Sequence, residues 1–192
     1  MARRASPLVQ TALFAKNFLQ HPLMLGSFIP SSRFLIRTLL GELDFDRARV
    51  IVEYGPGVGT FTREILARMR PDAILVALET NREFVDFLQR SIPDPRLKVI
   101  HGSAAAVQGA LKAHGARKAD FVISGIPFST LPAAEREAVL HATRAVLQPQ
   151  GAFLVYQFSP MVLASLRQVF SQVRRGFQPL NMPPAQLFYC TP

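Results

Sequence analysis

The sequence predicts an α/β protein with a mostly parallel β-sheet and helices on both faces. Short apolar runs alternate along residues 50–191 with segments in which apolar residues recur at helical spacing. This alternation is typical of parallel sheets, because each connection between parallel strands usually contains a helix. A length of 192 residues and a hydrophobic content of 49% are those of one packed domain.

Each expected element follows from its local pattern. Short apolar runs predict buried strands at residues 50–53, 73–79, 98–100, 120–124, 151–158 and 186–191. Apolar residues three or four positions apart predict helices at residues 61–69, 82–91, 104–114, 133–147 and 160–172. Prolines at positions 93, 95 and 149 mark the ends of two of these helices.

The composition excludes several classes of protein. No apolar run reaches about 18 residues, so we expect no membrane-spanning helix. The first 25 residues are basic and then apolar, but polar residues interrupt them, so we expect no secretory signal and a cytoplasmic protein. Cys190 is the only cysteine, which excludes a disulfide framework and a multi-cysteine zinc site. The four histidines show no ligand spacing, so we expect no metal.

Basic residues outnumber acidic ones by 22 to 13, which gives a net charge of +9. Residues 1–40 and the chain beyond Glu137 contain basic residues and no acidic ones. This surplus favours an anionic partner, either nucleic acid or an acidic membrane surface. A solvated surface with a chance asymmetry is the alternative.

Glycines and an acidic residue follow the first two predicted strands, at the edge where parallel α/β sheets bind ligands. Gly55, Gly57 and Gly59 alternate after the first strand, so a ligand can lie against the backbone there. Glu79 ends the second strand, where a carboxylate can accept both hydroxyls of a ribose. The spacing G-x-G-x-G departs from the dinucleotide pattern G-x-G-x-x-G and predicts a smaller nucleoside ligand.

Residues 52–59 (VEYGPGVG) resemble the first motif of the class I S-adenosylmethionine-dependent methyltransferases, and the resemblance extends over about residues 50–158. It implies a Rossmann-like fold with seven strands and S-adenosylmethionine as the cofactor. In that family the first motif holds the methionine part, the acid after the second strand holds the ribose, and the third strand end holds the adenine. The loop after the fourth strand closes over the sulfonium. The implied cofactor residues are Glu53, Tyr54, Gly55, Gly57, Gly59, Thr60, Glu79, Thr80, Gly102, Ser103, Ala104, Ser124, Gly125 and Ile126.

A closer resemblance covers nearly the whole chain. Residues 18–32 and 179–185 are similar to segments of the short, soluble bacterial phospholipid N-methyltransferases. Those enzymes convert phosphatidylethanolamine stepwise toward phosphatidylcholine at the membrane surface. The resemblance therefore implies a phospholipid substrate, an anionic membrane surface as partner and a peripheral position on the inner membrane surface. We expect a monomer with an N-terminal helical cap at residues 1–45 and a catalytic domain at residues 46–192.

The chain is also akin to the ribosomal RNA adenine dimethylases, whose fourth motif reads Asn-(Leu/Ile)-Pro-(Phe/Tyr). Here Ser124 and Gly125 precede Ile126, Pro127 and Phe128, and the asparagine that helps to hold an adenine is missing. The dimethylases also carry a helical domain after the core, which we do not expect here. Nucleic acid is therefore the weaker hypothesis. A methyltransferase for another amphiphilic small molecule and a non-catalytic nucleoside- or membrane-binding domain stay open.

The N-terminal segment provides further candidates for lipid contact. Residues 8–19 predict a broadly apolar helix with a narrow polar strip, and basic residues flank it. Such a helix can lie in an anionic lipid interface, although packing on the sheet is the alternative. The candidate substrate and membrane residues are Phe14, Lys16, Phe18, His21, Ile29, Arg33, Pro127, Phe128, Arg174 and Arg175.

Methyl transfer to nitrogen is mainly a matter of positioning, because the positive charge only passes from sulfur to nitrogen. The amine must arrive without its proton, and a free amine has a pKa of about 10. Desolvation or a nearby acceptor has to lower that pKa. The candidate catalytic residues are Tyr156 at the end of the fifth strand and Ser124 and Ile126 after the fourth, with Tyr54 as a second possible base.

Overall fold

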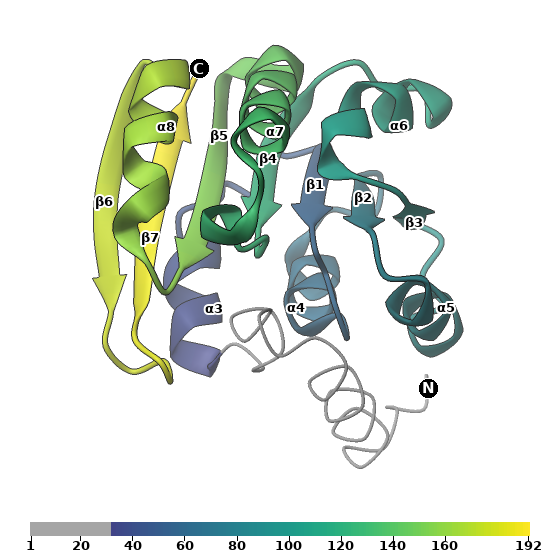
Figure 1. The fold of residues 1–192 in the computed structure, drawn as a ribbon. Helices are drawn as coiled ribbons and strands as arrows, with labels where there is room; N and C mark the ends of the chain where they lie inside the picture. Colours follow the sequence, from purple (N-terminus) through teal and green to yellow (C-terminus); the bar gives the residue numbers. More distant parts are fainter. Residues whose placement is uncertain (1–31) are drawn as a thin grey trace.

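Seven strands form one sheet in the computed structural model, which describes residues 32–192 (Figure 1). Their order across the sheet is β3-β2-β1-β4-β5-β7-β6. β1 to β5 run parallel, and β7 is antiparallel to both of its neighbours. The strands are β1 (Val50–Tyr54), β2 (Ile74–Glu79), β3 (Leu97–His101), β4 (Ala119–Ser124), β5 (Leu147–Gln157), β6 (Gln172–Gln178) and β7 (Ala185–Thr191). The predicted fold class is confirmed.

Within residues 32–192, six α-helices pack on the sheet. They are α3 (Arg33–Leu40), α4 (Thr60–Arg68), α5 (Arg82–Ser91), α6 (Val107–Ala113), α7 (Ala133–Val146) and α8 (Leu163–Val169). One apolar cluster joins the sheet to α6, α7 and α8, and a second joins its other face to α3 and α4. Both faces of the central strands are therefore buried, which is why these strands read as continuous apolar runs.

α3 is an integral part of this core. Ser32 caps it by accepting a hydrogen bond from the backbone N–H of Leu35, and the helix ends at Gly41. Its buried residues, which include Leu35 and Leu39, pack in the same cluster as α4 and β7. The described part of the predicted cap at residues 1–45 thus packs on the catalytic domain. The boundary itself stays a prediction.

Some candidates fall outside the described residues. The predicted helix at residues 8–19 is among them, and so are the candidate contacts Phe14, Lys16, Phe18, His21 and Ile29.

The C-terminal region differs from the prediction in one element. Residues 172–178 form the edge strand β6, which the apolar pattern did not indicate, and the predicted helix at 160–172 is shorter. It consists of a 3-10 turn at Pro160–Val162 followed by α8. β6 has only one neighbouring strand and four exposed residues, so it lacks the apolar run of a central strand.

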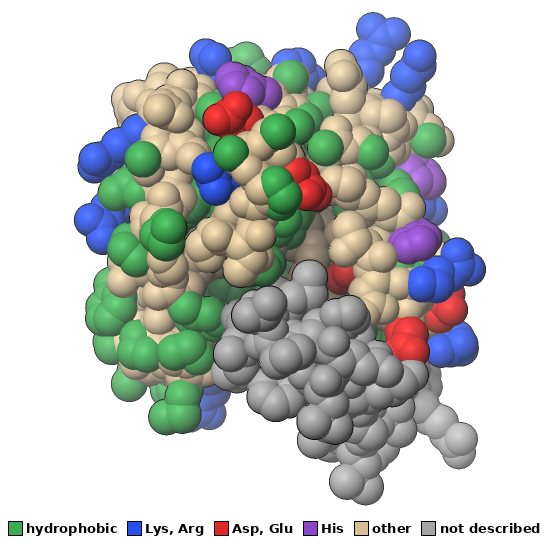
Figure 2. All heavy atoms as spheres, in the orientation of Figure 1, with side chains coloured by type: hydrophobic (Ala, Val, Ile, Leu, Met, Phe, Trp, Pro, Cys, Tyr) green, Lys and Arg blue, Asp and Glu red, His purple; other side chains and the backbone are tan. Residues whose placement is uncertain are grey.

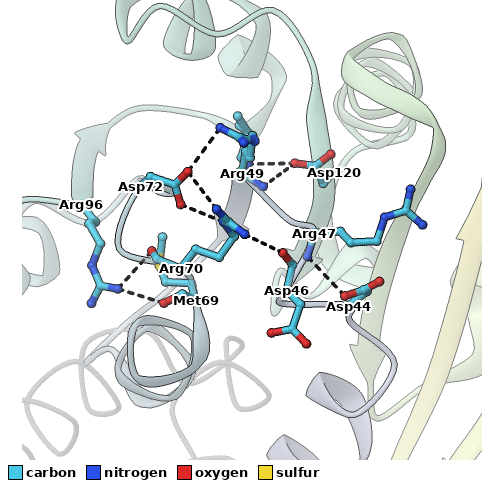
Figure 3. A network of polar contacts seen from close by, with 10 residues as sticks. Asp44, Asp46, Arg47, Arg49, Met69, Arg70, Asp72, Arg96 and Asp120 are labelled. Carbon is cyan, nitrogen blue, oxygen red and sulfur yellow. Dashed lines mark hydrogen bonds and ion pairs between the residues drawn. The ribbon is translucent and has the colours of Figure 1, made fainter.

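The amino ends of the strands are closed by a network of charged side chains (Figure 3). One carboxylate oxygen of Asp120 accepts the backbone N–H groups of Arg49 and Val50, at 2.8 and 2.9 Å, which ties β4 to β1. Asp72 pairs with Arg49 and Arg70 nearby, and hydrogen bonding to Arg70 lowers the pKa of Asp72. Structural ion pairs and hydrogen bonds therefore hold the strands together at this edge.

Within residues 32–192, none of the helices has both the length and the apolar character needed to cross a bilayer.

Candidate active site

A cavity of about 390 Å³ opens at the carboxyl ends of the parallel strands. Its volume lies within the range of roughly 300–1,000 Å³ that is usual for small-molecule sites. Predicted cofactor residues from four different strand ends meet in its lining: Gly55, Gly57, Glu79, Thr80, Gly102, Ser103, Ala104, Gly125 and Ile126. The parallel sheet brings them together, because all four loops leave the same edge.

Gly57 and Gly59, which follow β1, have different structural roles. Gly57 has a φ of +54°, and a Cβ there would meet no atom of residues 32–192 within 4 Å, so its backbone is accessible from the cavity. Gly59 has a φ of +78°, and a Cβ there would lie 2.7 Å from Leu88 and 2.8 Å from Ile92. Gly59 is thus needed for the close approach of α5, and it does not line the cavity.

Glu79 lies at the floor of the cavity, where its carboxylate is almost fully buried. One oxygen accepts the backbone N–H of Gly57 at 3.1 Å, and the other accepts that of Asn81 at 2.9 Å. Burial raises the pKa of Glu79, and these backbone N–H groups partly oppose that shift. A carboxylate has about four acceptor positions. The backbone N–H of Thr80 also interacts with this carboxylate, so about one position remains for a hydroxyl group of a ligand.

Two other predicted cofactor residues are buried behind the cavity. Glu53 accepts a hydrogen bond from the Thr62 hydroxyl at 2.7 Å, and burial raises the pKa of Glu53 to about 7. The hydroxyl of Tyr54 lies 3.1 Å from that of Thr143 under α7, and burial raises the pKa of Tyr54 above its usual value. Neither side chain lines the cavity, and Thr60 at the start of α4 does not either. Their contact with a cofactor stays a prediction.

The loop after β4 forms one wall of the cavity. Ser124 is fully buried, and its hydroxyl accepts the backbone N–H of Ile126 at 3.3 Å. Ile126 and Pro127 line the cavity, whereas Phe128 packs in the core against Phe153. Ser124 therefore shapes the turn that holds Ile126 and Pro127. Phe128, a candidate substrate residue, supports that turn from the core and does not line the cavity.

Tyr156 and Gln157 end β5 and point to opposite faces of the sheet. The Tyr156 ring stacks on Phe61 with a centroid distance of 4.9 Å, and its hydroxyl lies against Gly125, where no Cβ would fit. Gln157 is 5% exposed, and its side-chain nitrogen donates to the carbonyl of Ile126. The side-chain oxygen of Gln157 is buried without a hydrogen-bond partner. An orphaned acceptor is thus held beside the cavity wall.

Comparisons with known proteins agree with this geometry. A family model described as "Methyltransferase domain" matches residues 51–151. An ornithine lipid N-methyltransferase from Singulisphaera acidiphila is 32% identical over 180 residues, which are 93% of this chain and 94% of that protein. The chain belongs to the S-adenosylmethionine-dependent methyltransferases.

Two further proteins show a more limited similarity to the chain. A ribosomal RNA small subunit methyltransferase A from Laribacter hongkongensis is 32% identical over 101 residues, which cover 53% of this chain and only 33% of that protein. Human methyltransferase-like protein 13, solved in complex with SAH, aligns with a TM-score of 0.59 at 19% identity and covers 90% of this chain and 81% of its own. At that identity the structural likeness shows the fold.

The lining of this methyltransferase's cavity fits S-adenosylmethionine. Among the described residues of the lining, the charged ones are Glu79 and Glu135, although the chain as a whole carries +9. Gly57 gives backbone access, Glu79 keeps an acceptor position for a ribose hydroxyl, and Phe84 adds an apolar wall. When bound, the cofactor supplies a methyl group on a cationic sulfur. A negatively charged, partly apolar cavity is complementary to that charge.

Several lining residues were not predicted from the sequence. Asn81 caps α5 by accepting the Glu83 N–H at 2.8 Å, and this capping position directly after Glu79 is a signal that could have been used. Leu131, Glu135 and Val139 line the cavity at intervals of four residues, but only the fold shows which face of α7 meets the site. Gln157, which does not line the cavity but holds the carbonyl of Ile126, carried no sequence signal.

The basic candidates lie apart from this cavity. Arg33 is exposed with its guanidinium over the ring of Phe34, at 5.0 Å from the centroid. Arg174 pairs with Glu42, and Arg175 donates to the side-chain oxygen of Gln186 at 3.3 Å. Among residues 32–192, no three His, Cys, Asp or Glu side chains gather in a group that could hold a metal ion.

Proposed function

We propose that this methyltransferase adds methyl groups to the amine of a membrane lipid, with phosphatidylethanolamine and its mono- and dimethyl forms as acceptors on the way to phosphatidylcholine. We further propose that it acts as a peripheral protein on the inner membrane surface. The observation that carries this proposal is the charge of the cavity, which is acidic in a basic protein. The relative named for N-methylation of a lipid supports the same acceptor class.

The acidic cavity and the arginines outside it suit different groups of a lipid headgroup. Glu135 is an exposed carboxylate in the lining of the cavity, so it attracts an ammonium group. The arginines outside the cavity suit the anionic phosphates of lipid headgroups. A polyanionic acceptor such as RNA would have to bring its phosphates toward carboxylates. The amine of a zwitterionic lipid avoids that repulsion.

The apolar wall prepares the amine for reaction. Ile126, Pro127 and Leu131 exclude water from part of the cavity, and desolvation favours the neutral amine over the ammonium form. The proton leaves to solvent before the nitrogen reaches this wall. The neutral nitrogen then has a lone pair available for the methyl group.

Ornithine lipid is a second candidate acceptor, because the relative from Singulisphaera acidiphila is named for it. Its headgroup also presents a primary amine beside an anionic group, here a carboxylate. The cavity suits both amines equally well, so product analysis has to distinguish them.

The test uses labelled S-adenosylmethionine with the full chain. Parallel reactions contain vesicles of phosphatidylethanolamine with phosphatidylglycerol, vesicles of ornithine lipid with phosphatidylglycerol, phosphatidylglycerol alone and ribosomal RNA. We expect label in methylated ethanolamine lipids and none in phosphatidylglycerol or RNA. Label in ornithine lipid alone would show that ornithine lipid, and not phosphatidylethanolamine, is the acceptor. Label in RNA alone would overturn the proposal.

A further inference from the structure

A group of large apolar side chains is exposed at the β6–β7 hairpin and the start of α3. Phe177, Leu180 and Met182 are 56%, 61% and 83% exposed, and Phe34 beside them is 41% exposed. In Figure 2 hydrophobic side chains gather at the lower left, over these elements. We call these four residues the docking face. Contiguous exposed apolar residues of this size mark an interaction surface more often than scattered ones do.

The hairpin that presents the docking face is held in place by buried amides. Asn181 is 5% exposed, and its side-chain oxygen accepts the Ser32 N–H at 2.9 Å. Gln178 is also buried; its side-chain nitrogen donates to the Thr38 hydroxyl at 2.8 Å and its oxygen accepts the Leu180 N–H at 3.0 Å. The polar side chains thus point inward and the apolar ones outward, which is the reverse of an ordinary surface loop.

Arginines border the docking face. Arg33 and Arg37 lie one turn apart on α3, beside a groove between α3 and α4 that Arg68 also lines. The one carboxylate in the lining of this groove is Glu64, which pairs with Arg68 at 3.1 Å. Arg33 and Arg37 therefore present positive charge that no ion pair in the described structure neutralises.

The docking face and the cavity share one edge of the sheet. β6 ends at Gln178 on the edge where β1, β4 and β5 also end, and the hairpin extends from there (Figure 1). A flat surface that contacts the docking face therefore lies on the side to which the cavity opens. A lipid headgroup in that surface can reach the cavity while its acyl chains stay outside the protein.

We propose that the docking face binds an anionic lipid bilayer. Phe177, Leu180 and Met182 enter the boundary between headgroups and acyl chains, and Arg33 and Arg37 face the lipid phosphates. Apolar side chains next to arginines favour a bilayer over a protein partner. The apolar side chains match the boundary of the acyl chains, and the arginines match the lipid phosphates above it. This inference rests on the proposed function, because membrane binding would bring the enzyme to a lipid acceptor. The residues of the docking face are separate from those that line the cavity.

The test compares binding of the full chain and its variants to vesicles of phosphatidylethanolamine and phosphatidylglycerol by co-sedimentation. The first variant combines Phe177→Ser, Leu180→Ser and Met182→Ser. The second combines Arg33→Gln with Arg37→Gln. Its matched control, Arg47→Gln with Arg117→Gln, removes the same charge from exposed positions near the amino ends of β1 and β4. SAH affinity and thermal unfolding report whether each variant is intact.

We expect the triple variant to lose at least tenfold in vesicle affinity with unchanged SAH affinity. The Arg33 and Arg37 variant should lose affinity for anionic vesicles, and its matched control should not. Methylation of vesicle lipid should fall in step with binding, whereas methylation of dihexanoyl phosphatidylethanolamine below its micelle concentration should persist.

Two results would overturn the docking face and leave the proposed function standing. One is wild-type vesicle affinity in the triple variant. The other is a wild-type dimer that the triple variant dissociates, because a second copy would then cover these side chains. If the docking face is needed for vesicle binding but the wild-type chain methylates no lipid, the surface stands and the proposed function fails.

Discussion

Replacing Glu53 by glutamine should stabilise the protein above neutral pH. Glu53 is fully buried at the end of β1, and its carboxyl accepts one hydrogen bond from the Thr62 hydroxyl. Burial is the main cause that raises its pKa from 4.5 to about 7, and the nearby charge of Glu79 adds to it. Glutamine keeps the shape and the acceptor for Thr62 but carries no charge to desolvate.

The size of the effect follows from the two pKa values of Glu53. A raised pKa means that the folded state binds this proton more tightly than the unfolded state, so folding stability falls as the pH rises from 4.5 through 7. The shift of Glu53 from 4.5 to about 7 corresponds to roughly 3 kcal/mol, at about 1.4 kcal/mol for each pH unit. The free energy of unfolding of Glu53→Gln, relative to wild type, should therefore rise by that amount between pH 4.5 and 8.

Urea unfolding of wild type and Glu53→Gln at several pH values, without cofactor, measures this difference. Glu64→Gln on α4 is the matched control, because Glu64 is an exposed carboxylate that pairs with Arg68. Its difference from wild type should change little with pH. A Glu53→Gln difference that stays flat across this range, or that falls as the pH rises, would refute the reasoning.

Three further predictions concern the cavity and the core. Gly57→Ala should weaken SAH binding at least tenfold in calorimetry, whereas the control Gly115→Ala should not. Both glycines have a positive φ and space for a Cβ among the described residues, but only Gly57 lines the cavity. Equal SAH affinities of the two variants would contradict the cofactor site. Gln157→Leu removes the hydrogen bond that holds the carbonyl of Ile126 in the cavity wall, so it should lower kcat for lipid about tenfold, as expected for one lost hydrogen bond of roughly 1.4 kcal/mol. An unchanged kcat would show that this hydrogen bond does not position the wall. Cys190 is buried, and burial raises the pKa of its thiol from 9 to about 12. A thiol reagent at pH 8 should therefore label Cys190 roughly a thousandfold more slowly in the native than in the unfolded protein. Rapid labelling of the native protein would show that this region opens.

The elements that the sequence predicted well are those whose own residues are buried. β1, β2 and β4 are apolar runs because both of their faces pack under helices. β6 escaped prediction because its partner β7 supplies the burial, while its own arginines and Phe177 are exposed. An edge strand of this kind is defined by its neighbour rather than by its own pattern.

The same distinction applies to the site. Gly57 and Glu79 could be predicted because a turn at a strand end has a fixed place in a parallel sheet. Glu135 and Gln157 could not, since one depends on which face of α7 turns inward and the other on a carbonyl far away in sequence. The docking face was also missed, because Phe177, Leu180 and Met182 look like ordinary core residues until their exposure is known.

The most direct test of the account is to express the chain in a bacterium whose membranes contain phosphatidylethanolamine but no methylated form of it, and to analyse the lipids by mass spectrometry. The account predicts mono- and dimethylated phosphatidylethanolamine and phosphatidylcholine with the wild-type chain, and none with Gly57→Ala. An unchanged lipid profile with a folded, SAH-binding wild-type chain would contradict it.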